Sequence, residues 1–243
     1  MTHSAPSAPR PAGEGLDVSG LTVAVLGGTG PQGRGLAVRL AAVGQRVLLG
    51  SRDAARAGEV AAEVAARAAA VSAEGVEVSV RGGSNVDVSG AADLVIVAVP
   101  FGGHAATLAD LTAPLAGKVV VDCVVPMGFD ELGAYALDVP EGSVTQQAAA
   151  LLPDSAVVGA FHHLSAVLLE DLERSTLDGD VLVVGDDRKA TDTVQALAGR
   201  LPGMRGIYAG RLRNARQVEA LTINLVSVNR RYKVHAGVRV TDV

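Results

Sequence analysis

The feature that most constrains the fold is a glycine-rich turn between two apolar runs. The first run, residues 21–26, leads into Gly27-Gly28-Thr29-Gly30, and a helical pattern follows from Pro31 to Val43. A second apolar run, residues 46–49, comes after Gly44. This order predicts a strand, a turn, a helix and a strand, which is the context in which G-x-G-x-x-G indicates a dinucleotide site.

Each glycine of this motif has a separate expected role. Gly28 is expected to make the tight turn, Gly30 to let the backbone approach a pyrophosphate, and Gly33 to let the helix pack closely on the strand. Pro31 suits the first helical turn, where its missing N–H has no partner to lose. The helix N-terminus would then present free N–H groups and its positive dipole end to phosphates.

The residues after the second strand predict which dinucleotide is bound. Sites for NAD usually carry an acidic side chain here, which binds the ribose 2′-hydroxyl. This chain instead has Ser51 and Arg52, with Arg56 four residues on, and guanidinium groups suit a 2′-phosphate. Charge-assisted hydrogen bonds of roughly 1.5–3 kcal/mol each would favour NADP by about two orders of magnitude. Asp53 is expected to cap the next helix, and the alternative is that both arginines are solvated surface charges.

Beyond this unit, apolar runs alternate with helical patterns. Strands are predicted at residues 76–80, 93–99, 118–124, 156–161, 180–184 and 206–209, and helices at 53–73, 86–92, 105–115, 143–152, 189–201 and 215–233. The intervening residues 81–84 and 130–142 are expected to be loops. The alternation predicts an α/β fold, a Rossmann-type doubly wound, mostly parallel sheet with a smaller C-terminal helical region. Residues 1–19 are predicted to be a disordered leader, and residues 20–160 an NADP-binding domain.

Composition narrows the class of protein. Of the 243 residues 49% are hydrophobic but only 2% aromatic, which predicts an aliphatic core. The net charge of −5 gives no support for nucleic-acid binding, which favours basic faces. One cysteine, Cys123, excludes an intrachain disulfide and a thiolate-rich metal site. No apolar run approaches the roughly 18 residues of a membrane helix, and the N-terminus lacks the apolar segment of a secretory signal, so a cytoplasmic location is expected.

A second ligand site is predicted where several strands end. Ligands of doubly wound sheets bind outside the carboxyl ends of the strands. The expected lining there is apolar: Val99, Pro100, Phe101, Val124, Val125, Pro126, Leu164, Ala166 and Leu212. No Ser-His-Asp set, paired carboxylates or lysine base accompanies it. Such a lining suits hydride transfer between two redox rings, which needs a dry cleft and carbons held about 3–3.5 Å apart.

The histidines give weaker signals. His162 and His163 are adjacent, so in an extended segment they point to opposite faces and would not chelate one ion; no metal is expected. One of them is expected to form a hydrogen bond at the rim of the crevice, and the other to be structural. For His104, a loop histidine and a role near the cofactor are equally favoured, and His235 is expected to be structural. Cys123 is expected to be a small core residue.

Together these segments resemble the NADPH-dependent coenzyme F420 reductases, or F420:NADP oxidoreductases, of archaea and actinobacteria. The resemblance covers nearly all of the chain from Leu21 onward. It is carried by VLGGTGPQGRGLAVRL, GSR at 50–52, VAVP at 97–100, KVVVDCVVP, AFHHLSA at 160–166, VVGDD at 183–187 and GRLRNARQVEALTINLVSVNRRYK. The chain departs from archaeal members in its N-terminal leader, in the glycines after Phe101 and in the doubled histidine.

The resemblance implies reversible hydride transfer between C4 of the nicotinamide of NADP(H) and C5 of the deazaflavin of F420. It implies that Thr29, Ser51, Arg52 and Arg56 bind NADP, that Val125 and Ala166 form the nicotinamide pocket, and that Leu212 covers the deazaflavin. The full set of expected cofactor-binding residues is Gly28, Thr29, Gly30, Pro31, Gln32, Gly33, Ser51, Arg52, Arg56, Val99, Pro100, Phe101, Val125, Pro126, His162, Ser165, Ala166 and Leu212. Residues 161–243 would complete the deazaflavin site and form the interface of a homo-oligomer, a dimer or larger.

Three alternatives remain open at this point. The chain could reduce a flavin or an imine with NADPH, or it could bind NADP as a redox sensor without turnover.

The C-terminal region also carries basic residues that could meet the anionic tail of F420: Arg211, Arg213, Arg230, Arg231 and Lys233. They could equally serve the C-terminal end of a helix dipole.

Overall fold

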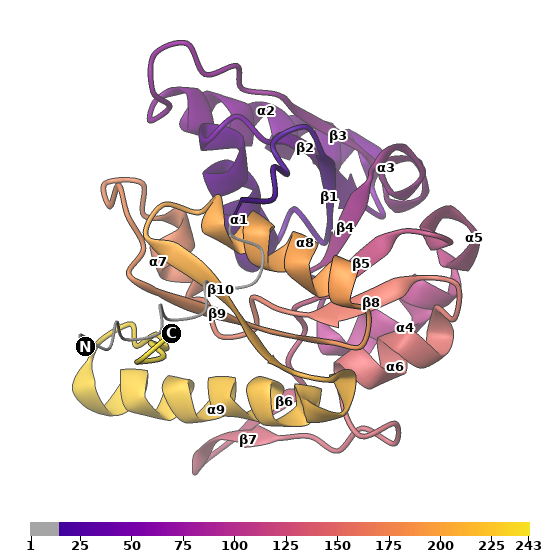
Figure 1. Ribbon diagram of the computed structural model, residues 1–243, viewed down its shortest axis with the longest axis vertical. Helices are drawn as coiled ribbons and strands as arrows, with labels where there is room; N and C mark the ends of the chain where they lie inside the picture. The colour runs from indigo at the N-terminus through magenta and orange to yellow at the C-terminus, as the bar shows by residue number, and fades with distance from the viewer. Residues whose placement is uncertain (1–14) are drawn as a thin grey trace, which may run out of the picture.

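The fold is organised around one eight-stranded sheet (Figure 1). The computed structural model describes residues 15–243, so most of the predicted leader lies outside the described residues. The strand order is β10-β9-β8-β5-β4-β1-β2-β3. The strands are β1 (Thr22–Leu26), β2 (Arg46–Ser51), β3 (Val80–Ser84), β4 (Leu94–Val97), β5 (Val119–Asp122), β8 (Ala156–Gly159), β9 (Gly179–Gly185) and β10 (Met204–Gly210). Within this sheet of the described residues, only β8 and β9 pair antiparallel, so the predicted mostly parallel α/β sheet is confirmed.

Helices cover both faces of the sheet. They are α1 (Pro31–Ala42), α2 (Ala54–Ala69), α3 (Asn85–Ala91), α4 (Phe101–Ala109), α5 (Thr112–Leu115), α6 (Val144–Leu151), α7 (Ala166–Glu170), α8 (Arg188–Gly199) and α9 (Ala215–Tyr232), with a 3-10 turn η1 (Leu212–Asn214). Side chains of α1, α2 and α8 pack with Val23 and Val25 of β1, whereas α3 to α6 pack with Ala24 and Leu26. Successive residues of a strand thus face opposite layers, as the pleat requires.

The chain after β5 adds elements outside these layers. A two-stranded hairpin, β6 (Met127–Asp130) and β7 (Gly133–Ala136), packs beside the long helix α9 (Figure 1). The loop expected at residues 130–142 was therefore wrong in part, because β7 lies within it. Within the described chain, no helix is both long and apolar enough to cross a membrane.

Two further elements have boundaries that differ from the prediction. One difference arises from the packing of a helix on a strand, and the other from a proline. The strand expected at residues 76–80 is β3, and it runs through the glycines that had indicated a loop. A Cβ on Gly82 would lie 2.1 Å from the carbonyl oxygen of Ala57, so glycine here lets α2 lie close on the strand. The helix expected at 105–115 begins at Phe101 and is broken, because a continuous helix would drive the ring of Pro114 into the carbonyl of Asp110.

Candidate functional site

The glycine turn lies between β1 and α1. Gly27 adopts the left-handed conformation, with φ of +72°, and the Gly30 N–H donates to the Gly27 carbonyl at 2.9 Å. Gly28 is a central residue of this tight turn, as predicted. A Cβ on Gly33 would lie 2.7 Å from the Gly27 carbonyl oxygen and 2.8 Å from Gly28 Cα. The expected close packing of α1 on the turn is therefore confirmed. Gly30 caps α1 with no side chain in the way, and Pro31 begins the helix.

A large open cleft of about 1160 Å³ lies in front of this helix N-terminus, at the carboxyl ends of β1, β2 and β4. Nine of the predicted residues line it: Thr29, Gly30, Pro31, Gln32, Ser51, Arg52, Arg56, Val99 and Pro100. Polar residues that the sequence had not singled out also line it, among them Ser84, Asn85, Thr107 and Asp110. The free N–H groups and the positive dipole end of α1 thus open into a space large enough for an extended anionic ligand.

One end of the cleft carries two free cationic side chains. Arg52 and Arg56 are exposed, and within the described residues neither forms an ion pair. Asp53, the acidic residue between them, accepts a hydrogen bond from the Arg56 backbone N–H at 3.1 Å and caps α2, as predicted. Its own N–H donates to Ser51 Oγ at 3.2 Å. Because this carboxylate serves the helix, both guanidinium groups remain available to a phosphate.

The chain leaving β5 lies between this cleft and a second cavity. In the sheet, Asp122 at the end of β5 pairs with Val97 of β4 on one side and with Gly159 of β8 on the other. The segment leaving β4 lines the large cleft, and the segment leaving β8 lines the second cavity. Residues 124–126 leave β5 between them; Val125 is half-buried and Pro126 is buried. Phe101 is also half-buried, packed against the core beside α4.

The second cavity is smaller, about 150 Å³, and lies beyond the end of β8. Leu164 and Ser165 line it together with the start of β9, Met204 and residues 235–238 near the chain end. Ser165 caps α7, which begins at Ala166, and its Oγ lies 3.4 Å from His235 Nδ1. This wall of the cavity therefore combines residues from both ends of the C-terminal region.

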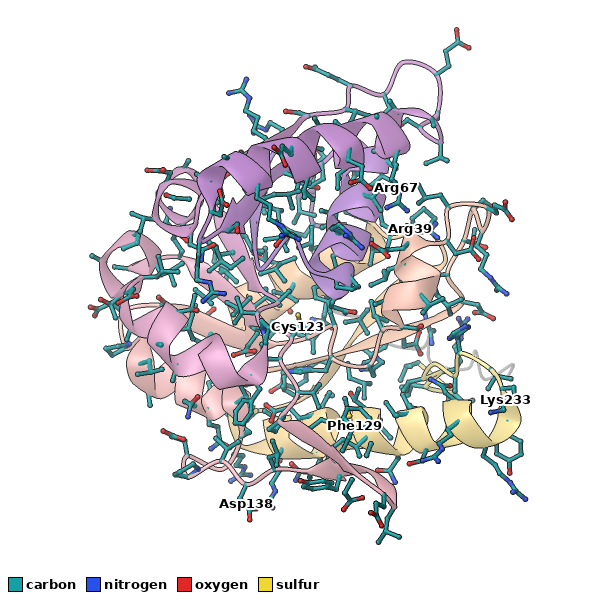
Figure 2. All side chains as sticks on the ribbon, turned by 180° about the vertical axis from the view of Figure 1, so that it is seen from behind. Arg39, Arg67, Cys123, Phe129, Asp138 and Lys233 are labelled. Carbon is teal, nitrogen blue, oxygen red and sulfur yellow. The ribbon has the colours of Figure 1, made fainter. Side chains whose placement is uncertain are left out.

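Arginines of the first two helices hold α7 in place. Arg39 of α1 is buried and donates to the carbonyl groups of Leu168, Leu169, Asp171 and Arg174 over 2.5–3.0 Å. Arg67 of α2 donates to the carbonyl of Glu170, whose carboxylate pairs with Arg34 at 2.8 Å. Figure 2 shows Arg39 and Arg67 close together beside α7. Helix α1, whose N-terminus opens into the large cleft, is thus tied by several hydrogen bonds to α7, which lines the second cavity.

The paired histidines point to different surroundings, as predicted. His163 Nε2 donates to the Asp180 carbonyl at 2.8 Å, which is the expected structural role. His162 is buried, and neither of its ring nitrogens has a partner among the described residues. Burial lowers the pKa of His162 to about 4, so the ring is neutral at pH 7. In residues 15–243 no three His, Cys, Asp or Glu side chains gather as a metal site would require.

His104 belongs to a buried polar group rather than to a loop. It lies in α4 with Nε2 2.7 Å from Asp122 Oδ2 and Nδ1 3.1 Å from Gln147 Oε1. Burial alone would lower its pKa, but the hydrogen bond and charge of Asp122 outweigh that effect and raise it. Sequence reasoning missed this group, although an aspartate inside the apolar run KVVVDCV was a signal for it.

Two other predicted residues lie elsewhere. Leu212 lines neither of the two cavities; it follows β10, and its N–H donates to Asp186 Oδ1 at 3.3 Å. Cys123 is buried in the core as predicted, and burial raises the pKa of its thiol.

The chain is similar to known proteins over most of its length. Residues 22–126 match the family model described as NADP oxidoreductase, coenzyme F420-dependent. An F420-dependent NADP reductase of Methanothermobacter marburgensis is 37% identical over 228 residues, which is 91% of this chain and 99% of that protein. The chain belongs to the F420-dependent NADP reductases. The corresponding protein of Methanocaldococcus jannaschii is 35% identical over 91% of this chain and 99% of its own length.

Solved structures place the same fold more widely. A provisional F420-dependent NADP reductase of Arthrobacter sp. FB24 superposes with a TM-score of 0.69 at 27% identity, covering 90% of this chain and 98% of that one. An imine reductase of Bacillus cereus superposes with a TM-score of 0.59 at 17% identity, covering 87% of this chain and 63% of its own. That second likeness shows a shared fold only.

Proposed function

We infer that this chain is an F420-dependent NADP reductase, which transfers a hydride reversibly between NADP(H) and the deazaflavin coenzyme F420. The observation that carries this inference is the pair of cavities on either side of the exit of β5, in a chain that belongs to this family. In the direction of F420 reduction the hydride leaves C4 of the nicotinamide and bonds to C5 of the deazaflavin. One proton from solvent completes the reduced ring.

NADP is proposed to lie in the large cleft. The N-terminus of α1, with Thr29, Gly30 and Gln32, would meet the pyrophosphate. Ser51, Arg52 and Arg56 would bind the 2′-phosphate, an assignment supported by the unpaired state of both arginines. The nicotinamide would then lie past Val99 and Pro100, toward Val125 and Pro126, where the lining turns apolar.

The deazaflavin is proposed to lie on the far side of the same exit, against residues 162–166. Leu164, Ser165 and the start of α7 at Ala166 would form one wall of this site. The small cavity that Leu164 and Ser165 line would have to widen to admit the deazaflavin ring. His162 has two ring nitrogens without partners, but it is buried and lines neither cavity, so it could bind a ring substrate only if this region rearranged. Leu212 could cover the deazaflavin only if this region rearranged, because it lines neither cavity.

A homo-oligomer, a dimer or larger, is proposed from the exposed apolar surface of the hairpin and α9. The chain has only six phenylalanine and tyrosine residues, and four of them are exposed. Three of these four lie on this surface: Phe129 is 66% exposed, Tyr135 45% and Tyr232 71%. In Figure 2 Phe129 lies where the hairpin crosses α9. Phe129 and Tyr135 project from opposite faces of the hairpin, because Phe129 pairs with Ala134 and Tyr135 with Gly128. Exposed aromatic side chains are enriched at protein–protein interfaces.

The function is tested by following the loss of the deazaflavin absorbance near 420 nm with NADPH or NADH as donor. Rapid loss with NADPH and little with NADH is the expected result. Binding of NADPH without any loss of F420 absorbance would instead favour a flavin reductase, an imine reductase or a redox sensor. Substrate screening with a flavin and a cyclic imine then distinguishes those alternatives.

A further inference from the structure

A chain of polar groups runs from the exposed Glu141 through the buried His104 and Asp122 to the backbone at the exit of β5. Gln147 Nε2 donates to Glu141 Oε2 at 3.1 Å, and Gln147 Oε1 lies 3.1 Å from His104 Nδ1. His104 Nε2 lies 2.7 Å from Asp122 Oδ2. The other carboxylate oxygen, Asp122 Oδ1, accepts the Val124 backbone N–H at 2.9 Å. The chain thus runs from the edge of α6 through α4 to the residues that leave β5.

The hydrogen bonds of this chain fix the protonation of His104. Because the Gln147 amide nitrogen donates to a carboxylate, its oxygen faces the imidazole and can only accept. Nδ1 must therefore carry a proton, and so must Nε2, which faces the carboxylate of Asp122. His104 and Asp122 are a buried ion pair, and neither side chain has any exposed surface. A buried pair of this kind adds little stability compared with packed apolar residues, so a geometric role explains it better.

The backbone that this pair holds is the one on which the proposed transfer depends. The Val124 N–H is bound by Asp122, and two residues on, the Pro126 carbonyl accepts the Leu137 N–H at 2.8 Å. Val125 lies between these two anchors. On one side the exit of β4 lines the large cleft, and on the other the exit of β8 lines the small cavity.

We propose that His104 and Asp122 are positioning residues that set the backbone of residues 124–126 and thereby the approach of the two rings. The proposal rests on the proposed function. A hydride passes between carbons held about 3–3.5 Å apart, and a displacement of about 1 Å lowers the rate by about 100-fold. Neither His104 nor Asp122 lines either cavity, so both act through Val124 rather than on a substrate.

Two substitutions at one position separate geometry from charge. Asp122→Ala removes the acceptor for Val124 and for His104. Asp122→Asn can keep its Oδ1 on the Val124 N–H while its amide nitrogen donates to a neutral His104. Val194→Ala, in the α8 side of the core, is the matched control for lost stability, because Val194 is equally buried but has no part in the chain.

The measurements are the single-turnover rate of F420 reduction at saturating NADPH, the NADPH dissociation constant, and the hydrogen exchange of the Val124 amide. For Asp122→Ala we expect a rate lowered about 10- to 100-fold, NADPH affinity within about twofold of wild type, and a Val124 amide that exchanges faster. Asp122→Asn should stay within about threefold of the wild-type rate and keep its amide protected. Val194→Ala should change neither.

Three results would overturn the proposal: equal rate losses in Asp122→Ala and Val194→Ala, an Asp122→Asn rate as low as that of Asp122→Ala, or unchanged exchange at Val124. If Asp122→Ala fails to fold, His104→Leu takes its place, with the same rate loss and faster exchange expected. Failure of the proposed function would show differently. The wild-type protein would then not reduce F420, while the amide exchange would still decide whether Asp122 holds Val124.

Discussion

The part of the molecule from β1 to β5 and the part from β6 onward are built in different ways. From β1 to β5, strands and helices alternate in chain order, all strands are parallel, and each helix lies close to its own strands. From β6 onward the chain forms a hairpin, reverses direction between β8 and β9, and returns along α9. The first part supplies the lining of the large cleft, and the second supplies the walls of the second cavity.

Contacts between residues far apart in the chain hold the second part in place. The carbonyl groups around α7 are bound by Arg39, about 130 residues earlier. The N-terminus of α6 is capped by Glu219, whose carboxylate accepts the N–H groups of Val144 and Thr145 at 3.0 Å. Burial raises the pKa of Glu219 even though these hydrogen bonds oppose the shift. Removing one such contact should therefore disturb the second part more than the first.

The largest expected effect comes from Arg39→Met. Four carbonyl groups would lose their donor at once, and an unsatisfied buried acceptor costs about 1–3 kcal/mol. Since some of the freed carbonyls can reach water, we expect the free energy of unfolding to fall by about 2–4 kcal/mol. Urea denaturation measures this change, and the second cavity should loosen before the large cleft does.

Arg67→Met is the control for that prediction. Arg67 also binds α7 from the first part, but through one carbonyl and a 4.0 Å ion pair with Glu170, and 31% of its side chain is exposed. Its loss should lower the free energy of unfolding by less than about 1 kcal/mol. Equal effects of the two substitutions would contradict the view that Arg39 is the main anchor between the two parts.

The second prediction concerns cofactor choice in the first part. Arg52→Val should raise the KM for NADPH by roughly 10- to 100-fold, because one charge-assisted hydrogen bond is worth about 1.5–3 kcal/mol. The KM for NADH should change little, since NADH has no 2′-phosphate. Arg188→Val, which removes an exposed arginine of α8 far along the sheet, should alter neither value. Equal losses for both cofactors in Arg52→Val would rule out the 2′-phosphate assignment.

The sequence predicted the part from β1 to β5 more accurately than the part from β6 onward. The turn, α1, β2 and the Asp53 cap were predictable because each depends on residues within one or two turns of the chain. Even there, β3 was misplaced, because Gly82 serves a contact with α2 that no local pattern reveals. In the second part the helices were found from periodicity, but the hairpin and the short α7 were not.

Side-chain partners were the least predictable feature. Ser51, Arg52 and Arg56 could be placed at the large cleft from their position at and after the end of β2, since the fold fixes where that strand ends. His104 could not, because its partners Asp122 and Gln147 come from β5 and α6, which meet only in the folded sheet. Arg39 is similar: on its own it is one more basic residue near a helix end.

The third prediction concerns the effect of pH on Asp180, which holds the C-terminal residues near Val240. Arg205 Nε and Nη2 donate to the two carboxylate oxygens of Asp180 at 2.7 and 2.8 Å, and Asp180 also accepts the Val240 N–H. Burial alone would raise the pKa of Asp180, but these bonds and the Arg205 charge outweigh it and lower the pKa below its ordinary value of 3.8. A carboxylate with a lowered pKa stabilises the fold above its unfolded pKa, and this stability is lost as pH falls through the folded pKa.

Asp180→Asn should therefore lower the Tm at pH 7 by about 3–6 °C. The difference from wild type should shrink as the pH falls below 3.8, because Asp180 then binds a proton in the unfolded state, whereas in the folded state it does so only at its lower pKa. Thermal unfolding at pH 7 and pH 3 measures both values. Asp87→Asn, on the exposed side of α3, provides the comparison: the same substitution at a carboxylate away from the C-terminal residues. A Tm difference that persists unchanged at pH 3 would argue against an ion-pair origin.

The smallest effect on folding is expected at the surface proposed for self-association. Phe129 and Leu132 on the hairpin are 66% and 96% exposed, so Phe129→Ser with Leu132→Ser should change the free energy of unfolding of the monomer by less than about 0.5 kcal/mol. The same pair should lower the mass measured by light scattering toward that of one chain on dilution, because an interface depends on its apolar centre. Val71→Ser removes an exposed apolar residue after α2 and should leave the mass unchanged. If the hairpin variant keeps the wild-type mass, the interface lies elsewhere, and the exposed aromatics of the second part then need another occupant.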